Sequence, residues 1–121
     1  MANPNIVNVA RILANTVTGT FISSNTVFVT NPASSGAVYK INSVTVTNID
    51  GAANADFDLI LNNQGSNNFI IKTVVVPSDA ALVAVDKNSG FYMLENSTIG
   101  GAASANDDLS YTISFEQLYD S

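Results

Sequence analysis

Apolar and polar residues alternate with a period of two along most of this chain, and this alternation restricts the possible folds more than any other feature. From Leu109 to Phe115, apolar side chains occupy every second position, with Ser or Thr between them. Successive side chains of a β-strand point to opposite faces, so the pattern predicts a strand with one buried and one hydrated face. A helix would scatter the same residues around its circumference. We therefore predict an all-β fold.

About eight segments show this strand pattern and are rich in Val, Ile, Thr, Phe and Tyr, which favour strands. They are residues 16–22, 26–30, 37–48, 56–61, 69–76, 82–86, 91–94 and 109–116. Within 37–48 the alternation slips by one residue at Asn42-Ser43, as a β-bulge would cause. Strands at spacings of roughly ten residues predict a single antiparallel β-sandwich or jelly-roll-like domain over residues 1–121.

Polar segments rich in Gly, Pro, Asn and Ser separate these strands and are predicted turns and loops. They are residues 31–36, 62–68, 77–79, 87–90 and 100–108. Asp50-Gly51 is a strong hairpin signal, although the alanines that follow favour a longer loop. Asn96-Ser97-Thr98 matches a glycosylation acceptor, which we interpret as a turn.

Residues 1–14 allow more than one interpretation. Asn3-Pro4 is a suitable helix start, but the Asn and β-branched residues that follow favour an extended arm or an edge strand. The apolar content of this stretch exceeds what a free terminus should expose, so it is a candidate partner-facing surface. An ordinary first strand fits equally well. The candidate interface residues are Ile6, Val7, Val9, Ile12 and Leu13.

The charge and the residue types that are missing exclude many functions. The chain has four basic and ten acidic residues and a net charge of −6, which argues against binding to nucleic acid or to a membrane surface. It has no Cys and no His, so disulfides, thiolate nucleophiles and the commonest general base and metal ligand are missing. The start of the chain lacks the pattern of a signal peptide, and we expect synthesis and folding in a cytoplasm.

Carboxylates are the remaining candidates for a metal site or for catalysis. Asp56 and Asp58 share one face of a predicted strand, with Asp50 in the loop before it, and a solvated face explains them better than a metal site does. Glu95 and Glu116 would have to form a catalytic pair, and their spacing does not bring them together. We expect no catalytic residues, no metal, no cofactor and no enzymatic activity.

A glycan-binding module is the alternative function within this fold class. The chain has no Trp, and most of its aromatic residues fall on predicted core faces. The rings expected in the core are Phe21, Phe28, Phe57, Tyr111 and Phe115. The rings that remain as plausible exposed sugar platforms are Tyr39, Tyr92 and Tyr119.

Several stretches resemble a family of small virion structural proteins of tailed phages, particularly large contractile-tailed phages of marine cyanobacteria. The similar stretches are residues 1–9, 38–44, 47–51, 84–89 and 109–116. The resemblance implies a capsid decoration or cement protein, or a neck or tail component at a head or tail interface. It also implies a virion location and the major capsid protein or another virion protein as partner, with no catalytic residues. Small decoration proteins often occupy local three-fold positions, so we expect a homo-oligomer, with a trimer as the first hypothesis.

Overall fold

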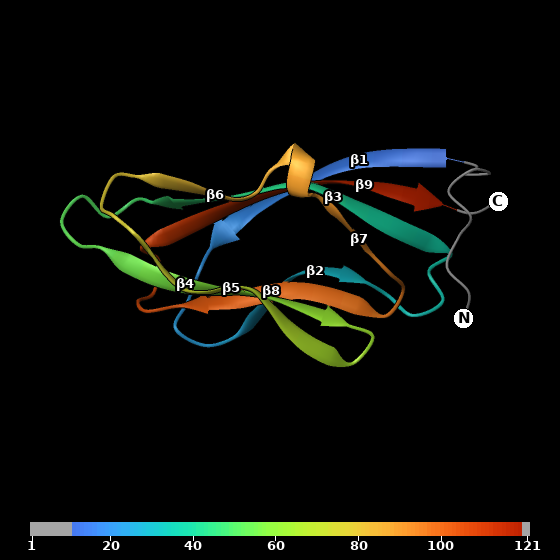
Figure 1. The fold of residues 1–121 in the computed structure, drawn as a ribbon, viewed down its shortest axis with the longest axis horizontal. Coiled ribbons are helices and arrows are strands. Elements are labelled where there is room, and N and C mark those ends of the chain that lie inside the picture. Colours follow the sequence, from blue (N-terminus) through green and yellow to red (C-terminus); the bar gives the residue numbers. More distant parts are fainter. Residues whose placement is uncertain (1–10, 120–121) are drawn as a thin grey trace.

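Two antiparallel sheets pack face to face in the part of the chain that the computed structural model describes, residues 11–119 (Figure 1). The strands are β1 (Arg11–Thr20), β2 (Thr26–Asn31), β3 (Ala37–Asn48), β4 (Ala55–Asn63), β5 (Ser66–Val76), β6 (Ala81–Val85), β7 (Phe91–Met93), β8 (Ser97–Ala103) and β9 (Leu109–Tyr119), and the short 3-10 helix η2 (Lys87–Ser89) precedes β7. One sheet has the order β1-β9-β3-β6, with β7 also paired to β3, and the other has the order β2-β8-β4-β5. The predicted all-β sandwich is confirmed, with nine strands rather than eight in the described range.

The long strands β3 and β9 form the centre of the first sheet. They pair from Ala37 opposite Tyr119 to Asn48 opposite Leu109, and the register shifts between Ile41 and Ser43. This shift confirms the bulge predicted at Asn42-Ser43. A bulge moves the side chains that follow by one position, which keeps the apolar residues on both sides of it facing the core.

Strand β8 is the main error in the sequence prediction, which placed a turn at 96–98 and a loop from Gly100 to Asp108. The structure has a strand from Ser97 to Ala103, paired to β2 on one side and to β4 on the other. A Cβ atom added at Gly100 would collide with the backbone of Thr26, and one at Gly101 would collide with the backbone of Asp58. Small residues are needed here because backbones approach closely, so the usual strand signal of bulky residues is missing.

The connection between β4 and β5 is also shorter than predicted. The expected loop over 62–68 is a two-residue turn, with Gln64 (φ 54°) and Gly65 (φ 96°) both in the left-handed region. Such turns match the twist of the flanking strands. The side chain of Asn62 accepts a hydrogen bond from the N–H of Gly65 at 2.8 Å and so stabilises the turn. Asn62 was predicted to lie in the loop, but it belongs to the end of β4.

The N-terminal prediction is confirmed in part. Residues 11–14 belong to β1, which continues without interruption into the predicted strand that began at residue 16. The edge-strand interpretation is therefore correct for residues 11–14, while residues 1–10 lie outside the described part of the chain.

The core lies between the two sheets and is mainly aliphatic, with aromatic rings joining the layers. Phe21, Phe57 and Phe115 are buried, as predicted. Phe28 and Tyr111 are partly buried against this core and stack on each other, with ring centroids 4.1 Å apart. Pairs of this kind add about 0.5–1.5 kcal/mol each beyond the area that they bury.

Two buried asparagines connect the layers near the two ends of β3. The side-chain amide of Asn31 donates to the carbonyl oxygens of Ala37 and Met93, both at 3.0 Å. The side-chain amide of Asn48 donates to the carbonyl oxygens of Ala53 and Val76, at 3.0 and 2.9 Å. Each side chain, itself buried, thus uses its amide group to bond to two backbone carbonyls.

Candidate functional site

The edge of the first sheet at β1 is the first candidate site. β1 pairs with β9 over ten consecutive positions, from Arg11 opposite Tyr119 to Thr20 opposite Ser110, without a register shift. No described strand pairs with its other edge (Figure 1). Most of its residues are exposed. An unpaired strand edge presents backbone N–H and C=O groups that another strand can bind.

The other sheet edges in the described range have features that discourage such pairing, and β1 lacks most of them. β2 and β6 are short and have register shifts, and β7 has only three residues. β5 has two register shifts and carries a charge at Lys72 beside the left-handed Thr73. Bulges, charges and short length are the usual protections of an edge. β1 has one charge, Arg11 at its first position, and its guanidinium lies 4.3 Å from the ring centroid of Tyr119.

Two predicted interface residues lie on β1, and both are exposed. Ile12 is 57% exposed and Leu13 is 44% exposed. Because they are neighbours in a strand, they point to opposite faces of the sheet and do not form one patch. Ile12 lies opposite Leu118 of β9, which in turn lies opposite Val38 of β3, so these three form an apolar row across the sheet. The other predicted interface residues, Ile6, Val7 and Val9, lie outside the described residues.

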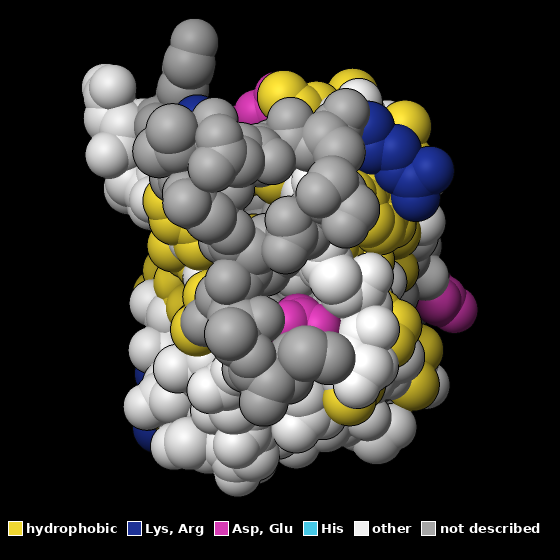
Figure 2. All heavy atoms as spheres, turned by 90° about the vertical axis from the view of Figure 1, so that its right-hand side faces the viewer, with side chains coloured by type: hydrophobic (Ala, Val, Ile, Leu, Met, Phe, Trp, Pro, Cys, Tyr) yellow, Lys and Arg dark blue, Asp and Glu magenta, His cyan; other side chains and the backbone are white. Residues whose placement is uncertain are grey.

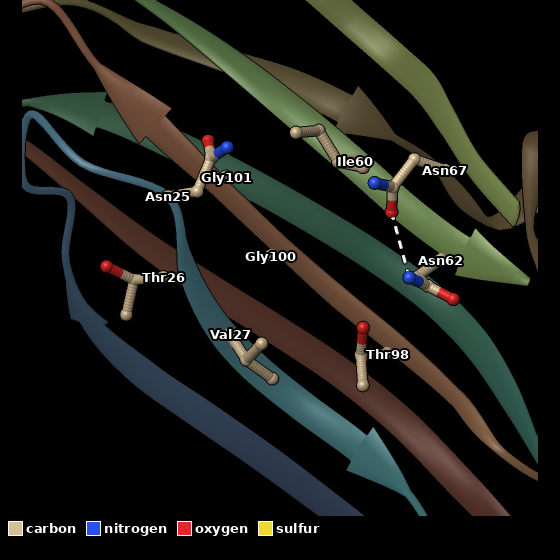
Figure 3. A pocket seen from close by; sticks show the side chains of 9 residues that line it. All are labelled: Asn25, Thr26, Val27, Ile60, Asn62, Asn67, Thr98, Gly100 and Gly101. Carbon is tan, nitrogen blue, oxygen red and sulfur yellow. Dashed lines mark hydrogen bonds between the residues drawn. The ribbon is translucent and has the colours of Figure 1, made fainter. Parts of the chain in front are cut away.

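A shallow groove on the outer face of the second sheet is the second candidate (Figure 3). Its volume is about 170 Å³. Gly100 lies in the middle of the group of lining side chains, and the amide of Asn62 donates to the side-chain oxygen of Asn67 at 2.9 Å. The residues that line it are uncharged and include no aromatic ring: Asn25, Thr26, Val27, Ile60, Asn62, Asn67, Thr98, Gly100 and Gly101. This groove was not predicted, and the Gly100-Gly101 pair, which the sequence placed in a loop, was the available signal.

The three tyrosines predicted as exposed sugar platforms have different environments. Tyr39 is only 6% exposed and stacks on Phe115, so that prediction is wrong: Tyr39 faces the core on the same side of β3 as Ile41. Burial raises the pKa of Tyr39, and the nearby Tyr119 raises it further. Tyr119 is partly buried, and Tyr92 is exposed.

Two of the carboxylates that were considered for a metal site have local structural roles. Asp50 accepts a hydrogen bond from the N–H of Ala52 at 2.9 Å, and Asp58 accepts one from the N–H of Thr73 at 2.7 Å. Residues 11–119 contain no group of three or more His, Cys, Asp or Glu side chains placed to hold a metal ion. Burial of Asp56 and Asp58 is intermediate, in keeping with the solvated face that was predicted.

Glu95 and Glu116, the pair that was considered and rejected as catalytic, are in unlike environments. Glu95 follows β7 and is buried, whereas Glu116 belongs to β9 and accepts a hydrogen bond from the amide of Asn42 at 3.4 Å. Within the described range, no hydrogen bond connects the two. The structure also contains, in that range, no helix long and apolar enough to cross a membrane.

The comparisons with known proteins identify no family. No protein-family model matches the sequence, and no curated protein matches it. One solved structure that resembles it comes from the disulfide-linked pili that form Bacillus endospore appendages. The two chains are 12% identical, with a TM-score of 0.43, and the likeness covers 91% of this chain and 89% of the other.

Proposed function

We propose that this protein is a non-enzymatic structural subunit that binds other protein subunits through the open edge of β1. The observation that carries the proposal is the contrast between this edge and the others: β1 is long, regular and exposed, and its only charge is at its first residue. Strand addition to such an edge gives affinity through backbone hydrogen bonds. Exposed Ile12 and Leu13 add apolar area on both faces of the new strand pair.

We propose, more specifically, that the assembly is a virion and that the chain is a capsid decoration protein of a large tailed phage infecting marine cyanobacteria. This finer proposal rests on the sequence resemblance. A net charge of −6 favours solubility of the free subunit before assembly. A homo-oligomer, with a trimer as the first hypothesis, would bind several capsid sites at once and would dissociate slowly. A neck or tail component is the alternative location.

The test is incorporation into particles, compared between two matched variants. Ile12→Lys places a charge on β1, and Val83→Lys places one on β6, where Val83 is as exposed as Ile12 (58% and 57%). We expect gradient-purified particles to contain the wild-type chain and the Val83→Lys variant, and to contain the Ile12→Lys variant in greatly reduced amount. Absence of the wild-type chain from particles, despite expression in infected cells, would contradict the virion proposal.

A glycan-binding module is the second candidate, and the groove over Gly100 is the observation that favours it. The amide groups of Asn25, Asn62 and Asn67 lie around it and can bond to sugar hydroxyl groups. A glycan array with the wild type and Asn67→Ala separates the two functions. Binding that Asn67→Ala removes would support the module, while the assembly proposal predicts no glycan bound at this groove.

A further inference from the structure

A buried carboxylate at one end of the sandwich lacks a full set of partners. Glu95, between β7 and β8, is only 2% exposed. Its Oε2 accepts a hydrogen bond from the N–H of Gly36 at 3.1 Å, whereas its Oε1 has no hydrogen-bond partner among the described residues. A buried, ionised carboxylate is costly unless a cation or several donors compensate it. The structure therefore shows a buried carboxylate oxygen whose hydrogen-bonding capacity is not satisfied by any described residue.

A pocket of about 220 Å³ adjoins this carboxylate. Its lining comes from three connections: Ala33 and Ser34 from β2–β3, Gln64 from β4–β5, and Glu95 with Asn96 from β7–β8. These connections lie together at the right-hand end of the molecule in Figure 1. Figure 2 looks onto that end, where a small acidic patch borders uncharged atoms. The volume is large enough for an ion together with several water molecules.

The groups around the pocket are hard oxygen ligands. The amide nitrogen of Gln64 donates to the backbone oxygen of Glu95 at 3.2 Å. The amide oxygen of Gln64 takes no part in this bond. The side chains of Ser34 and Asn96 supply hydroxyl and amide oxygens. Carboxylate, amide and hydroxyl oxygens completed by water suit calcium, whereas zinc and copper prefer imidazole or thiolate ligands.

We propose that this pocket is a calcium site, with Oε1 of Glu95 as its one charged ligand. A site with one charged ligand should be weak, with a Kd in the range of about 10⁻⁴–10⁻³ M that is typical of low-affinity calcium modules. The proposal does not depend on the proposed function.

Calcium at this position would connect the two sheets. The β2–β3 and β7–β8 connections each cross from one sheet to the other, and the β4–β5 hairpin belongs to the second sheet. An ion bound to all three connections stabilises the folded state because the unfolded chain has no such site. The expected result is a melting temperature that rises with calcium concentration.

The test is thermal unfolding and isothermal titration calorimetry with calcium chloride at constant ionic strength. Calcium is raised to roughly 10 mM, which is about ten times the upper end of the expected Kd range. For the wild type we expect a saturable rise in Tm and a matching heat of binding. Glu95→Gln preserves side-chain size and an acceptor for the N–H of Gly36, and should weaken calcium binding at least tenfold. The matched control Glu116→Gln should bind calcium like the wild type.

Titration of the wild-type protein followed by amide NMR tests the location without any substitution. Calcium should shift the resonances of residues 33–36, 64–65 and 95–97 together. No saturable binding, an equal response in Glu95→Gln, or shifts centred on Asp56 and Asp58 would each overturn the proposal. The NMR result decides the question even if Glu95→Gln fails to fold.

Discussion

The side chain of Tyr111 in β9 lies across Gly19, its partner in β1. A Cβ atom added at Gly19 would be 2.5 Å from the hydroxyl oxygen of Tyr111 and 2.8 Å from its Cζ atom. The same ring stacks on Phe28 of the other sheet and meets Phe21 edge-on at 5.7 Å. The glycine therefore makes room for a ring that connects β1 to the core, an arrangement in which an aromatic neighbour covers a strand glycine.

Gly19→Val should destabilise the protein, because its side chain would occupy the volume that Tyr111 fills. Overpacking of this kind costs roughly 1–3 kcal/mol. The free energy of unfolding in urea measures the loss. Ala14→Val, at an exposed position of the same strand, should change it little. An equal loss in both variants would mean that strand propensity, rather than contact with Tyr111, controls the effect.

Asn31→Asp should lower the stability of the fold by more than the small change in side-chain structure suggests. The substitution removes both hydrogen bonds to Ala37 and Met93 and places a carboxylate at a fully buried position. Loss of a hydrogen bond to a buried group costs about 1–3 kcal/mol, so the two lost bonds should together lower the unfolding free energy by roughly 2–6 kcal/mol. The control Asn63→Asp changes an exposed asparagine at the end of β4. Unfolding curves for Asn31→Asp that match those of the wild type would contradict this role.

Stability should fall at alkaline pH because two tyrosines ionise less easily in the folded state than in the unfolded chain. Burial raises the pKa of Tyr39 and of Tyr111 above 10.0, and Tyr119 adds to the shift at Tyr39. The folded state retains protons that the unfolded chain loses above about pH 10, so the contribution is complete below that pH and declines above it. Thermal unfolding between about pH 8 and pH 11 measures the decline. The variant Tyr111→Phe should show a smaller one.

Asp86 should control the short helix η2 in a pH-dependent way. Its carboxylate accepts hydrogen bonds from the N–H groups of Ser89 and Asn88, at 2.8 and 2.9 Å. The hydroxyl oxygen of Ser89 accepts a hydrogen bond from the N–H of Asp86 at 3.0 Å, which completes a capping box. These bonds, those to Ser89 first, lower the pKa of Asp86 below 3.8. Helix capping is therefore complete above that pH and is lost as the pH falls through the lowered folded-state value.

Asp86→Ala should accordingly speed hydrogen exchange at the amide of Ser89, while amides in β3 exchange as in the wild type. Unchanged exchange at Ser89 would show that the cap does not hold this turn.

The alternation of apolar and polar residues predicted the strands in which one face is apolar and the other is polar. The strand from Leu109 to Phe115 and the bulge at Asn42-Ser43 followed directly from which residues are apolar, because the period of a strand ties each residue to one face. The separate interpretation of Tyr39 as an exposed sugar platform failed, because its position on β3 points inward.

The alternating pattern by itself thus determined the fold class, most of the strands and most of the core. The reason is local: successive side chains of a strand point to opposite faces, so the sequence shows which face is apolar. Only the tertiary structure decided the rest: that Gly100 and Gly101 lie in a central strand, that one edge of β1 is left without a partner among the described strands, and that Glu95 is buried beside a pocket built from three distant connections. Each of these depends on which backbones become neighbours. That pairing is a property of the assembled sheets, which no single stretch of sequence encodes.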